Sequence, residues 1–402
     1  MSQVPASAPA NLRLRVIPSI AEIDAAKWDA CANPSAQHHP YNPFISYDFL
    51  HALESSGSAT ARTGWQPQHL LAEDADGDIL GAVPCYLKSH SRGEYVFDRG
   101  WAEAYERAGG QYYPKLQVSV PFTPATGRRL LLRPGPQAEA IRTGLIAGLA
   151  ELCRTHEASS IHVTFLPEPE CQALIEHGFL HRTDQQFHWE NAGYGSFDAF
   201  LEALSARKRK TIRRERREAL APGISVHWLT GNELTEEIWD TFFEFYMETG
   251  SRKWGRPYLT RNFYTLMGER MADKIVLIMA KRAGRFVAGA INFIGSDTLF
   301  GRHWGANEHH PFLHFELCYY QAIDFAIARG LKRVEAGAQG EHKLARGYLP
   351  VTTHSAHFIA DQGLRRAVAD YLARERAYVE SAGAELAAMA PFRKDLEHDA
   401  GI

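Results

Sequence analysis

The chain has 402 residues, of which 45% are hydrophobic and 23% charged, with a formal net charge of −3. This length predicts about two to three domains. The small net charge excludes a global field for nucleic acid, no stretch approaches the ~18 apolar residues of a membrane span, and the N-terminus lacks a secretory signal. Five scattered cysteines exclude a disulfide framework and a zinc cluster. We therefore expect a globular, cytoplasmic protein.

The first half of the chain alternates strand and helix patterns after a disordered leader at residues 1–10. Asp76-Gly77-Asp78 is a strong hairpin turn signal. The proline-punctuated aromatic stretch at 111–124 excludes a central strand and indicates loops that line a surface. The predicted strands cover residues 12–17, 70–73, 79–87, 160–165 and 186–190, and the predicted helices cover 20–30, 47–54, 101–107, 137–156 and 168–177.

The second half repeats this order. Residues 79–83 and 287–291 have similar sequences and lie at the same place in the two predicted hairpins. The repeat predicts a duplicated α/β unit with the order β-α-α-β-β-β-α-β. The predicted strands cover residues 224–229, 275–281, 285–293, 298–304 and 333–336, and the predicted helices cover 233–249, 260–271 and 312–329.

A basic helix is predicted to connect the two halves. Residues 207–217 hold eight cations in eleven positions. Such a run is typical of a solvated helix face, and it also suits a phosphate-rich partner such as tRNA. We predict an N-terminal domain at 11–195, a connector at 196–222, a C-terminal domain at 223–362 and a helical tail at 363–402.

The densest group of reactive side chains follows the last predicted strand, at residues 335–348. Two carboxylates, an imidazole, an amide and two cations share this segment with three glycines. Glycines allow close backbone approach to a ligand, although Gly-rich polar segments are also ordinary solvated turns. The candidate side chains are Glu335, Gln339, Glu341, His342, Lys343 and Arg346.

Two neighbouring segments add to this group. On a helical count, Glu316 falls on the apolar side of the 312–329 helix, where its carboxylate would be desolvated unless a cation or donor meets it. The strand at 298–304 ends at His303, whose imidazole, with a near-neutral pKa beside Glu335, would suit deprotonation of an amine. Arg302, Lys343 and Arg346 would hold phosphate or carboxylate, or form surface ion pairs.

Other chemistries lack their motifs. His310 and His314 have the i, i+4 spacing of two helical metal ligands, but no His-Glu-x-x-His pattern occurs. The chain also has no P-loop, no Gly-x-Ser-x-Gly elbow and no Rossmann glycine signature. We therefore predict no metal, and hydrolase and dinucleotide-binding functions are disfavoured.

Five blocks between about Asn42 and Ala360 resemble the bacterial FemAB-like predicted N-acyltransferases, which are labelled peptidoglycan biosynthesis/recognition proteins. The resemblance implies two tandem GNAT-like domains with mixed sheets. It also implies transfer of an acyl group from acyl-CoA, or of an aminoacyl group from tRNA, to an amine. Residues 302–306 only loosely match the GNAT pyrophosphate loop. The blocks cover residues 112–117, 120–124, 302–305, 313–321 and 335–343.

The first hypothesis is thus an N-acyltransferase that acts on a small-molecule or peptide amine, such as a cell-wall precursor, with tRNA as a further candidate partner. The second is a non-catalytic GNAT-like pair that binds a cell-wall precursor or tRNA, and the third is a metalloenzyme that uses residues 309–314. The expected catalytic residues are His303, Glu316, Glu335 and His342, and the expected substrate-binding residues are Tyr113, Lys115, Arg128, Arg302, Trp304, Gln339, Glu341, Lys343 and Arg346.

Overall fold

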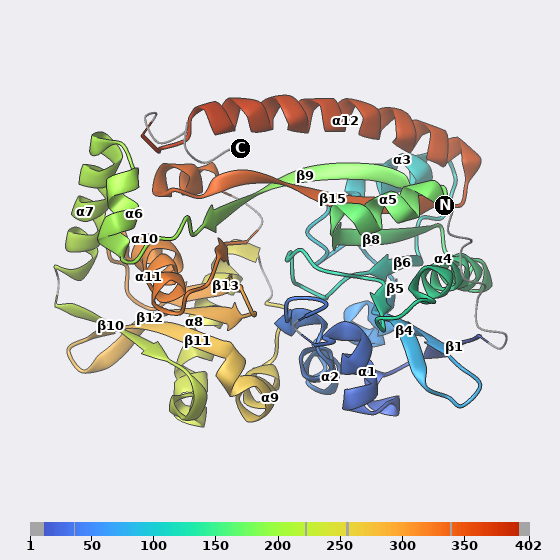
Figure 1. Ribbon diagram of the computed structural model, residues 1–402, viewed down its shortest axis with the longest axis horizontal. Helices are drawn as coiled ribbons and strands as arrows, with labels where there is room; N and C mark the ends of the chain where they lie inside the picture. Colours follow the sequence, from blue (N-terminus) through green and yellow to red (C-terminus); the bar gives the residue numbers. More distant parts are fainter. Residues whose placement is uncertain (1–11, 36, 222, 255–256, 338–339, 394–402) are drawn as a thin grey trace. The chain divides into compact units, whose positions relative to one another are not determined.

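The computed structural model describes the chain except residues 1–11, 36, 222, 255–256, 338–339 and 394–402 (Figure 1). The described chain forms two compact units. The first contains the residues up to Asp184 together with Thr353–Val379, and the second contains Gln185–Thr352 together with the residues from Glu380 on. The chain leaves the first unit along β9 (Leu180–Glu190) and returns along β15 (Leu349–Ile359). The domain boundaries expected from the sequence stay a prediction.

The first unit contains two sets of paired strands. One has the order β1-β3-β4-β7, and in the other β2, β5, β6 and β8 are followed by the second part of β15. The helix α4 (Ala138–Thr155) contacts β3, β4 and β8, and buries Leu145 and Leu149. The strands are β1 (Arg13–Ile17), β2 (Trp65–Pro67), β3 (His69–Glu73), β4 (Ile79–Val83), β5 (Cys85–Lys88), β6 (Lys115–Val118), β7 (Leu131–Leu132) and β8 (Ser160–Leu166), and the other helices are α1 (Ala25–Ala32), α2 (Tyr47–Ser55), α3 (Arg99–Arg107) and α5 (Glu168–Glu176).

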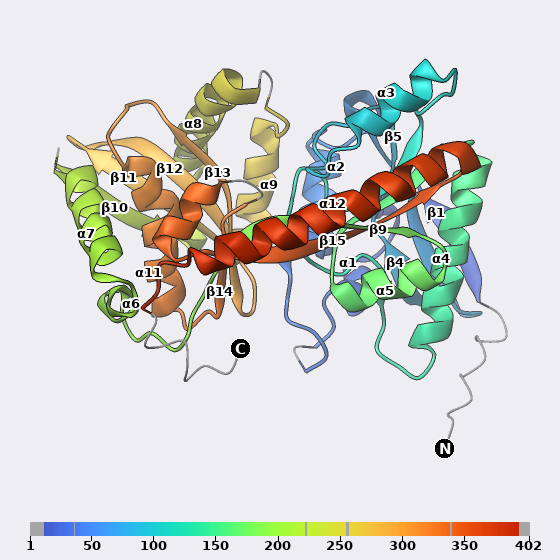
Figure 2. The ribbon, with the colours of Figure 1, turned by 90° about the horizontal axis from the view of Figure 1, so that it is seen from above.

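The second unit has an antiparallel run from β10 to β13, followed by β14 parallel to β13. Its sheet is buried on both faces, with α8 on one side and α11 on the other (Figure 2). The strands are β10 (Ile224–Leu229), β11 (Ile275–Arg282), β12 (Arg285–Ile294), β13 (Thr298–Ala306) and β14 (Arg333–Glu335), and the helices are α6 (Phe197–Ala203), α7 (Ala206–Leu220), α8 (Glu236–Trp254), α9 (Arg261–Met271), α10 (Leu313–Phe315) and α11 (Gln321–Ala328).

Each unit contains a pair of parallel neighbouring strands that are joined through a helix. In the first unit α4 lies between β6 and β8, and in the second α10 and α11 lie between β13 and β14. A helix is needed in each case because two parallel neighbouring strands run in the same direction and cannot be joined by a tight turn. The predicted mixed α/β class is confirmed, and so is the C-terminal helix, α12 (Gln362–Ala388).

Two expectations from the first half were wrong. The strand predicted at 79–87 is divided at Pro84 into β4 and β5, which pair with different neighbours, because proline has no N–H for a ladder. The 111–124 stretch does contain a central strand, since β6 lies between β5 and β8. Its prolines stand outside the four paired residues, so they interrupt no hydrogen bond.

Within the described residues, no helix has both the length and the mean hydropathy that a bilayer span requires.

The close packing of α8 on β13 generates the first prediction. A Cβ atom at Gly305 would lie 2.0 Å from the carbonyl oxygen of Phe245, which is backbone and cannot move aside alone. We expect Gly305→Ala to lower the free energy of unfolding by about 1–3 kcal/mol through overpacking. Chemical denaturation measures the change. Gly100→Ala is the control, because nothing lies within 4 Å of the added atom, and an equal loss in both variants would contradict the packing described for Gly305.

Candidate functional site

A cavity of about 610 Å³ opens in the second unit where β13 ends and α10 begins. The turn between them has Phe312 in the left-handed region at φ 62°. The helix then continues through one π-helical turn, Glu316–Tyr320, into α11. Single π-helical turns within α-helices are frequent at functional sites. The lining residues are Glu248, Thr249, Trp304, Ala306, Asn307, Glu308, His309, His310, Phe312, Leu313, His314 and Phe315.

Three separate segments bring aromatic and imidazole rings together beside this cavity. Trp304 on β13 and His314 on α10 have ring centroids 5.1 Å apart. The imidazole of His342, on the 3-10 helix Glu341–Arg346, lies 6.4 Å from that of His314. The hydroxyl of Tyr319 is 2.9 Å from Nε2 of His342. Because Trp304 and His314 line the cavity and His342 is exposed, this cluster can meet a ligand there.

His303 has a different environment from the one expected. Its ring packs 5.0 Å from that of Tyr246. Burial, with a smaller contribution from the charge of Arg302, lowers the pKa of His303 to about 3. The imidazole is therefore neutral at pH 7, but it is a weak general base, since an effective one has a pKa near the working pH. The near-neutral pKa expected for His303 was wrong because the strand end is covered by α8.

Glu335 and Lys343 are both buried near the start of the 335–348 segment. Glu335 ends β14 and lies 4.0 Å from Nε2 of His188. The ammonium of Lys343 donates to the carbonyl of Gly337 at 2.9 Å. Burial lowers the pKa of Lys343 to about 8, so it still carries a positive charge at pH 7. The side chains of Gln339 and Glu341, which the sequence analysis also selected, lie outside the described residues.

Arg346 and Glu316 are engaged in buried ion pairs. One guanidinium nitrogen of Arg346 donates to both carboxylate oxygens of Glu215, at 3.1 and 2.9 Å. The carboxylate of Glu316 is fully buried, as the helical count predicted, and the cation that meets it is Arg216 at 3.0 Å. Such pairs hold segments together, because removing one partner leaves an uncompensated buried charge.

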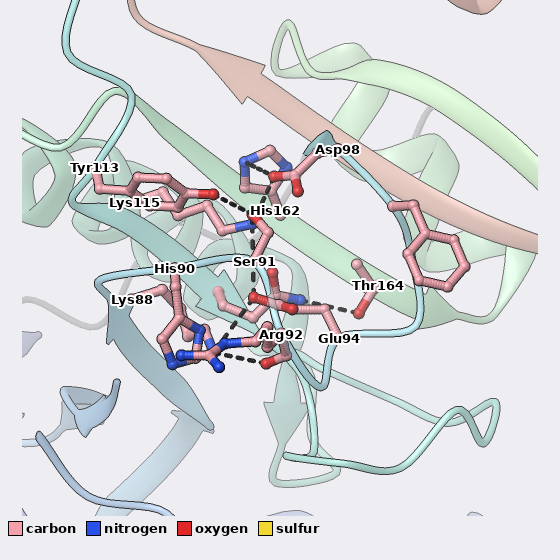
Figure 3. A network of polar contacts seen from close by, with 12 residues as sticks. Lys88, His90, Ser91, Arg92, Glu94, Asp98, Tyr113, Lys115, His162 and Thr164 are labelled. Carbon is pink, nitrogen blue, oxygen red and sulfur yellow. Dashed lines mark hydrogen bonds and ion pairs between the residues drawn. The ribbon is translucent and has the colours of Figure 1, made fainter. Parts of the chain in front are cut away.

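The first unit holds a second network, which is fully internal (Figure 3). Lys88 and Lys115 are register partners on β5 and β6. Lys115 lies 2.5 Å from Asp98 and 3.6 Å from Glu94, and Lys88 lies 3.3 Å from Glu94. Burial, with the charge of Lys115, lowers the pKa of Lys88 to about 7. The two carboxylates come from the loop after β5, so two like charges on neighbouring strands are compensated locally.

The other residues selected in the first unit have internal partners too. Both Tyr113 and Lys115 contact the hydroxyl of Ser91 at 2.8 Å. The guanidinium of Arg128 donates to the carbonyls of Cys31 and Ala32 at the end of α1. These contacts give Arg128 a capping role on α1.

Sequence reasoning missed several residues that the structure places at these sites. Glu215 is the one acid within 207–217, and Ile212, Glu215 and Ala219 are buried together on one face of α7. That spacing was a readable signal. His314 and Tyr319 were within a block that carried the resemblance, but no pattern in the sequence marks their approach to His342.

Among the described residues, no three His, Cys, Asp or Glu side chains group as metal ligands. His310 instead lies 2.8 Å from Glu308, which also pairs with Arg282.

Comparison with known proteins identifies one matching family and several similar structures. A sequence model of the FemAB-like family, described as peptidoglycan biosynthesis/recognition, matches residues 19–394. The structure of FemX is similar, with 13% identity, a TM-score of 0.54, and coverage of 86% of this chain and 98% of that chain. A conserved protein of unknown function from Bacteroides thetaiotaomicron has 12% identity, a TM-score of 0.52, and coverage of 86% and 99%. None of the curated proteins matches the chain.

A tandem GNAT protein from the clavulanic acid biosynthesis pathway is also found, with 13% identity and a TM-score of 0.44, covering 87% of this chain and 99% of that chain. The first two similarities extend over nearly the whole length of both chains. These two similarities show a shared fold. The mixed α/β fold with a C-terminal helix is confirmed, and its description as two tandem GNAT-like domains stays a prediction.

The buried neutral histidines generate a prediction about acid stability. Burial lowers the pKa of His162, His188 and His303 to about 3, whereas a histidine in the unfolded chain titrates near about 6.5. Between these values the unfolded chain binds protons that the folded chain does not, so stability falls as the pH drops below about 6.5. Each histidine contributes up to about 1.4 kcal/mol per pH unit.

Urea denaturation between pH 7.5 and pH 5 measures this slope. His303→Phe should make it shallower, whereas the exposed His177→Gln should leave it unchanged. A wild-type stability that is flat or rises on acidification across this range would contradict the prediction.

The buried network of the first unit generates a further prediction. Lys115→Met leaves Asp98, which is 2% exposed, without its closest cation, and should destabilise the protein by about 3–5 kcal/mol. Lys115→Met combined with Asp98→Leu should recover part of that loss, because no unpaired charge remains. Lys27→Met removes a pair in which both side chains are about half exposed and should cost less than about 1 kcal/mol. Thermal denaturation measures both losses. An equal loss of stability in Lys27→Met and Lys115→Met would contradict the importance of the buried Lys115–Asp98 pair.

Proposed function

Because the chain belongs to the FemAB-like family of peptidoglycan biosynthesis/recognition proteins, we propose that it is a transferase that moves an acyl or aminoacyl group onto an amine. The observation that carries this proposal is the ring cluster of Trp304, His314 and His342 at the cavity beside β13. It places an exposed imidazole, with a hydroxyl partner, next to a space large enough for a ligand.

The chemistry follows from the groups at hand. An amine attacks the carbonyl carbon of a thioester or ester donor, and His342, which is hydrogen-bonded to Tyr319, takes the proton that the amine loses. Negative charge then develops on the carbonyl oxygen. Lys343, one residue along the same segment, carries the positive charge that would stabilise it. Collapse of the tetrahedral intermediate breaks the C–S or C–O bond and leaves the amide, and His342 returns its proton to the leaving sulfur or oxygen, so that the thiol or alcohol is released.

The donor is acyl-CoA or aminoacyl-tRNA. Support for a tRNA donor comes from α7, where the cations that face outward form an exposed basic surface. These exposed side chains are Arg207, Lys210, Arg213, Arg214 and Arg217. The acceptor would be a small-molecule or peptide amine of a peptidoglycan precursor, and a cytoplasmic location remains our expectation.

One observation favours the alternative of a binding protein without catalysis. Glu316 and Arg346, two of the groups selected from the sequence, are held in internal ion pairs, and His303 is a weak base. In this alternative the cavity binds a precursor or the end of a tRNA and no bond is formed. Turnover separates the two functions.

Mass spectrometry with a panel of amine acceptors, each offered with acetyl-CoA, a longer acyl-CoA or aminoacyl-tRNA, tests the proposal. We expect an added acyl or aminoacyl mass on the acceptor. His342→Gln and Lys343→Met should each lower kcat by about 10²-fold or more, whereas Lys27→Met on the surface of the first unit should leave it unchanged.

Saturable binding of a donor, seen as a raised unfolding midpoint, with no acyl product from any pair would favour the binding protein. Unchanged rates in both site variants, with a product formed, would remove His342 and Lys343 from the mechanism.

A further inference from the structure

The basic helix α7 has an inner face that carries charge of its own. Ile212, Glu215 and Ala219 are its buried residues, and Glu215 is only 6% exposed. A carboxylate in that position is costly unless it is paired and hydrogen-bonded. Figure 1 places α7 beside α10 and α11, and α7 also contacts the 3-10 helix Glu341–Arg346. The inner face of α7 therefore meets both segments that form the candidate site.

Glu215 is linked to His342 through a single side chain. Its two carboxylate oxygens accept from Arg346 at 3.1 and 2.9 Å, and it also accepts from the hydroxyl of Tyr320. Arg346 in turn donates from its other terminal nitrogen to the carbonyl of His342 at 2.7 Å. The guanidinium lies 3.5 Å from the ring centroid of Phe315, which lines the cavity.

The next residue of α7 makes the complementary contact with the helix. Arg216 pairs with Glu316 at 3.0 Å, within the π-helical turn, and with Asp324 at 2.7 Å on α11. Two adjacent residues of opposite charge, Glu215 and Arg216, thus hold two different segments of the site. Glu215 holds the segment that carries His342 and Lys343, and Arg216 holds the helix that carries His314.

The segment at 341–346 depends on this support because it is a short helix of the weaker 3-10 type. It is a 3-10 helix bounded by Gly340 and Gly347, both with positive φ, 118° and 88°. A 3-10 helix has poorer hydrogen-bond geometry than an α-helix, and such segments open at low free energy. The guanidinium of Arg346 bridges Glu215 and the carbonyl of His342 through its two terminal nitrogens, so it fixes the position of the segment at two points.

We infer that Glu215 is a positioning residue for the transfer reaction: through Arg346 it holds His342 and Lys343 in register with the cavity. This inference rests on the proposed function for its catalytic consequence, but the positioning itself is a structural property that can be measured without turnover. Glu215 touches neither substrate nor reacting atoms in this role.

Glu215→Gln tests the inference, because glutamine keeps the shape of the side chain but removes the charge that Arg346 faces. Glu218→Gln is the matched control on the same helix, since Glu218 is exposed and its nearest cation, Arg214, is 3.7 Å away. Hydrogen exchange of the 341–348 amides should be about tenfold faster or more in Glu215→Gln, a larger increase than for the amides of α11. The unfolding midpoint should also fall, because Arg346 loses its buried charged partner. Glu218→Gln should exchange as the wild type does.

In the transfer assay Glu215→Gln should lower kcat by about 10- to 100-fold with a smaller change in KM, since a displaced catalytic group affects the chemical step. Glu215→Asp should recover part of that rate. Arg346→Lys keeps the charge but lacks the two terminal nitrogens that bridge Glu215 and the carbonyl of His342, so it should also make the 341–348 amides exchange faster.

Wild-type exchange at 341–348 in both Glu215→Gln and Arg346→Lys would overturn the inference. An equal increase in exchange throughout the second unit in both variants would also overturn it, because Glu215 would then support the unit as a whole. If the wild type shows no turnover, the proposed function fails while the exchange data still decide whether Glu215 positions the segment.

Discussion

A charge that leaves water requires a partner of opposite sign, and this constraint organises both units of the protein. In the first unit, the loop after β5 bends back so that Glu94 and Asp98 can meet the lysines on β5 and β6. In the second, Glu215 and Arg216 on α7 meet Arg346 and Glu316 on different segments. The two pairs of the second unit connect residues 131 and 100 positions apart, so they are also tertiary restraints.

The same constraint separates supporting residues from residues that can do chemistry. Glu316, Arg346 and Lys115 have charged partners at close range, so they are committed to the fold. His342 is exposed beside a cavity, and Lys343 bonds to a carbonyl rather than to a carboxylate. Exposure gives His342 access to a ligand, and Lys343, which is buried, contributes its positive charge, which is why the proposed reaction is placed on them.

Much of the fold could be read from local patterns because those patterns report local physics. The strands predicted at 275–281 and 285–293 are present as β11 and β12, which are nearly continuous buried apolar runs, and the repeated order predicted the duplication. The prolines were misjudged. Pro84 was placed inside one strand although it separates β4 from β5, and the prolines at 111–124 were taken to exclude a strand although β6 begins directly after Pro114.

By itself, the sequence determined the α/β class, the family resemblance, and the burial of Glu316, since helical periodicity is a property of the chain alone. Only the tertiary structure decided which ion-pair partners Glu316 and Arg346 have. Arg346 pairs with Glu215, 131 positions away, and Glu316 pairs with Arg216, 100 positions away. No local sequence pattern specifies which distant charged residue will be the partner. The pKa of His303 was likewise decided by the packing of α8, because desolvation depends on everything that surrounds a side chain.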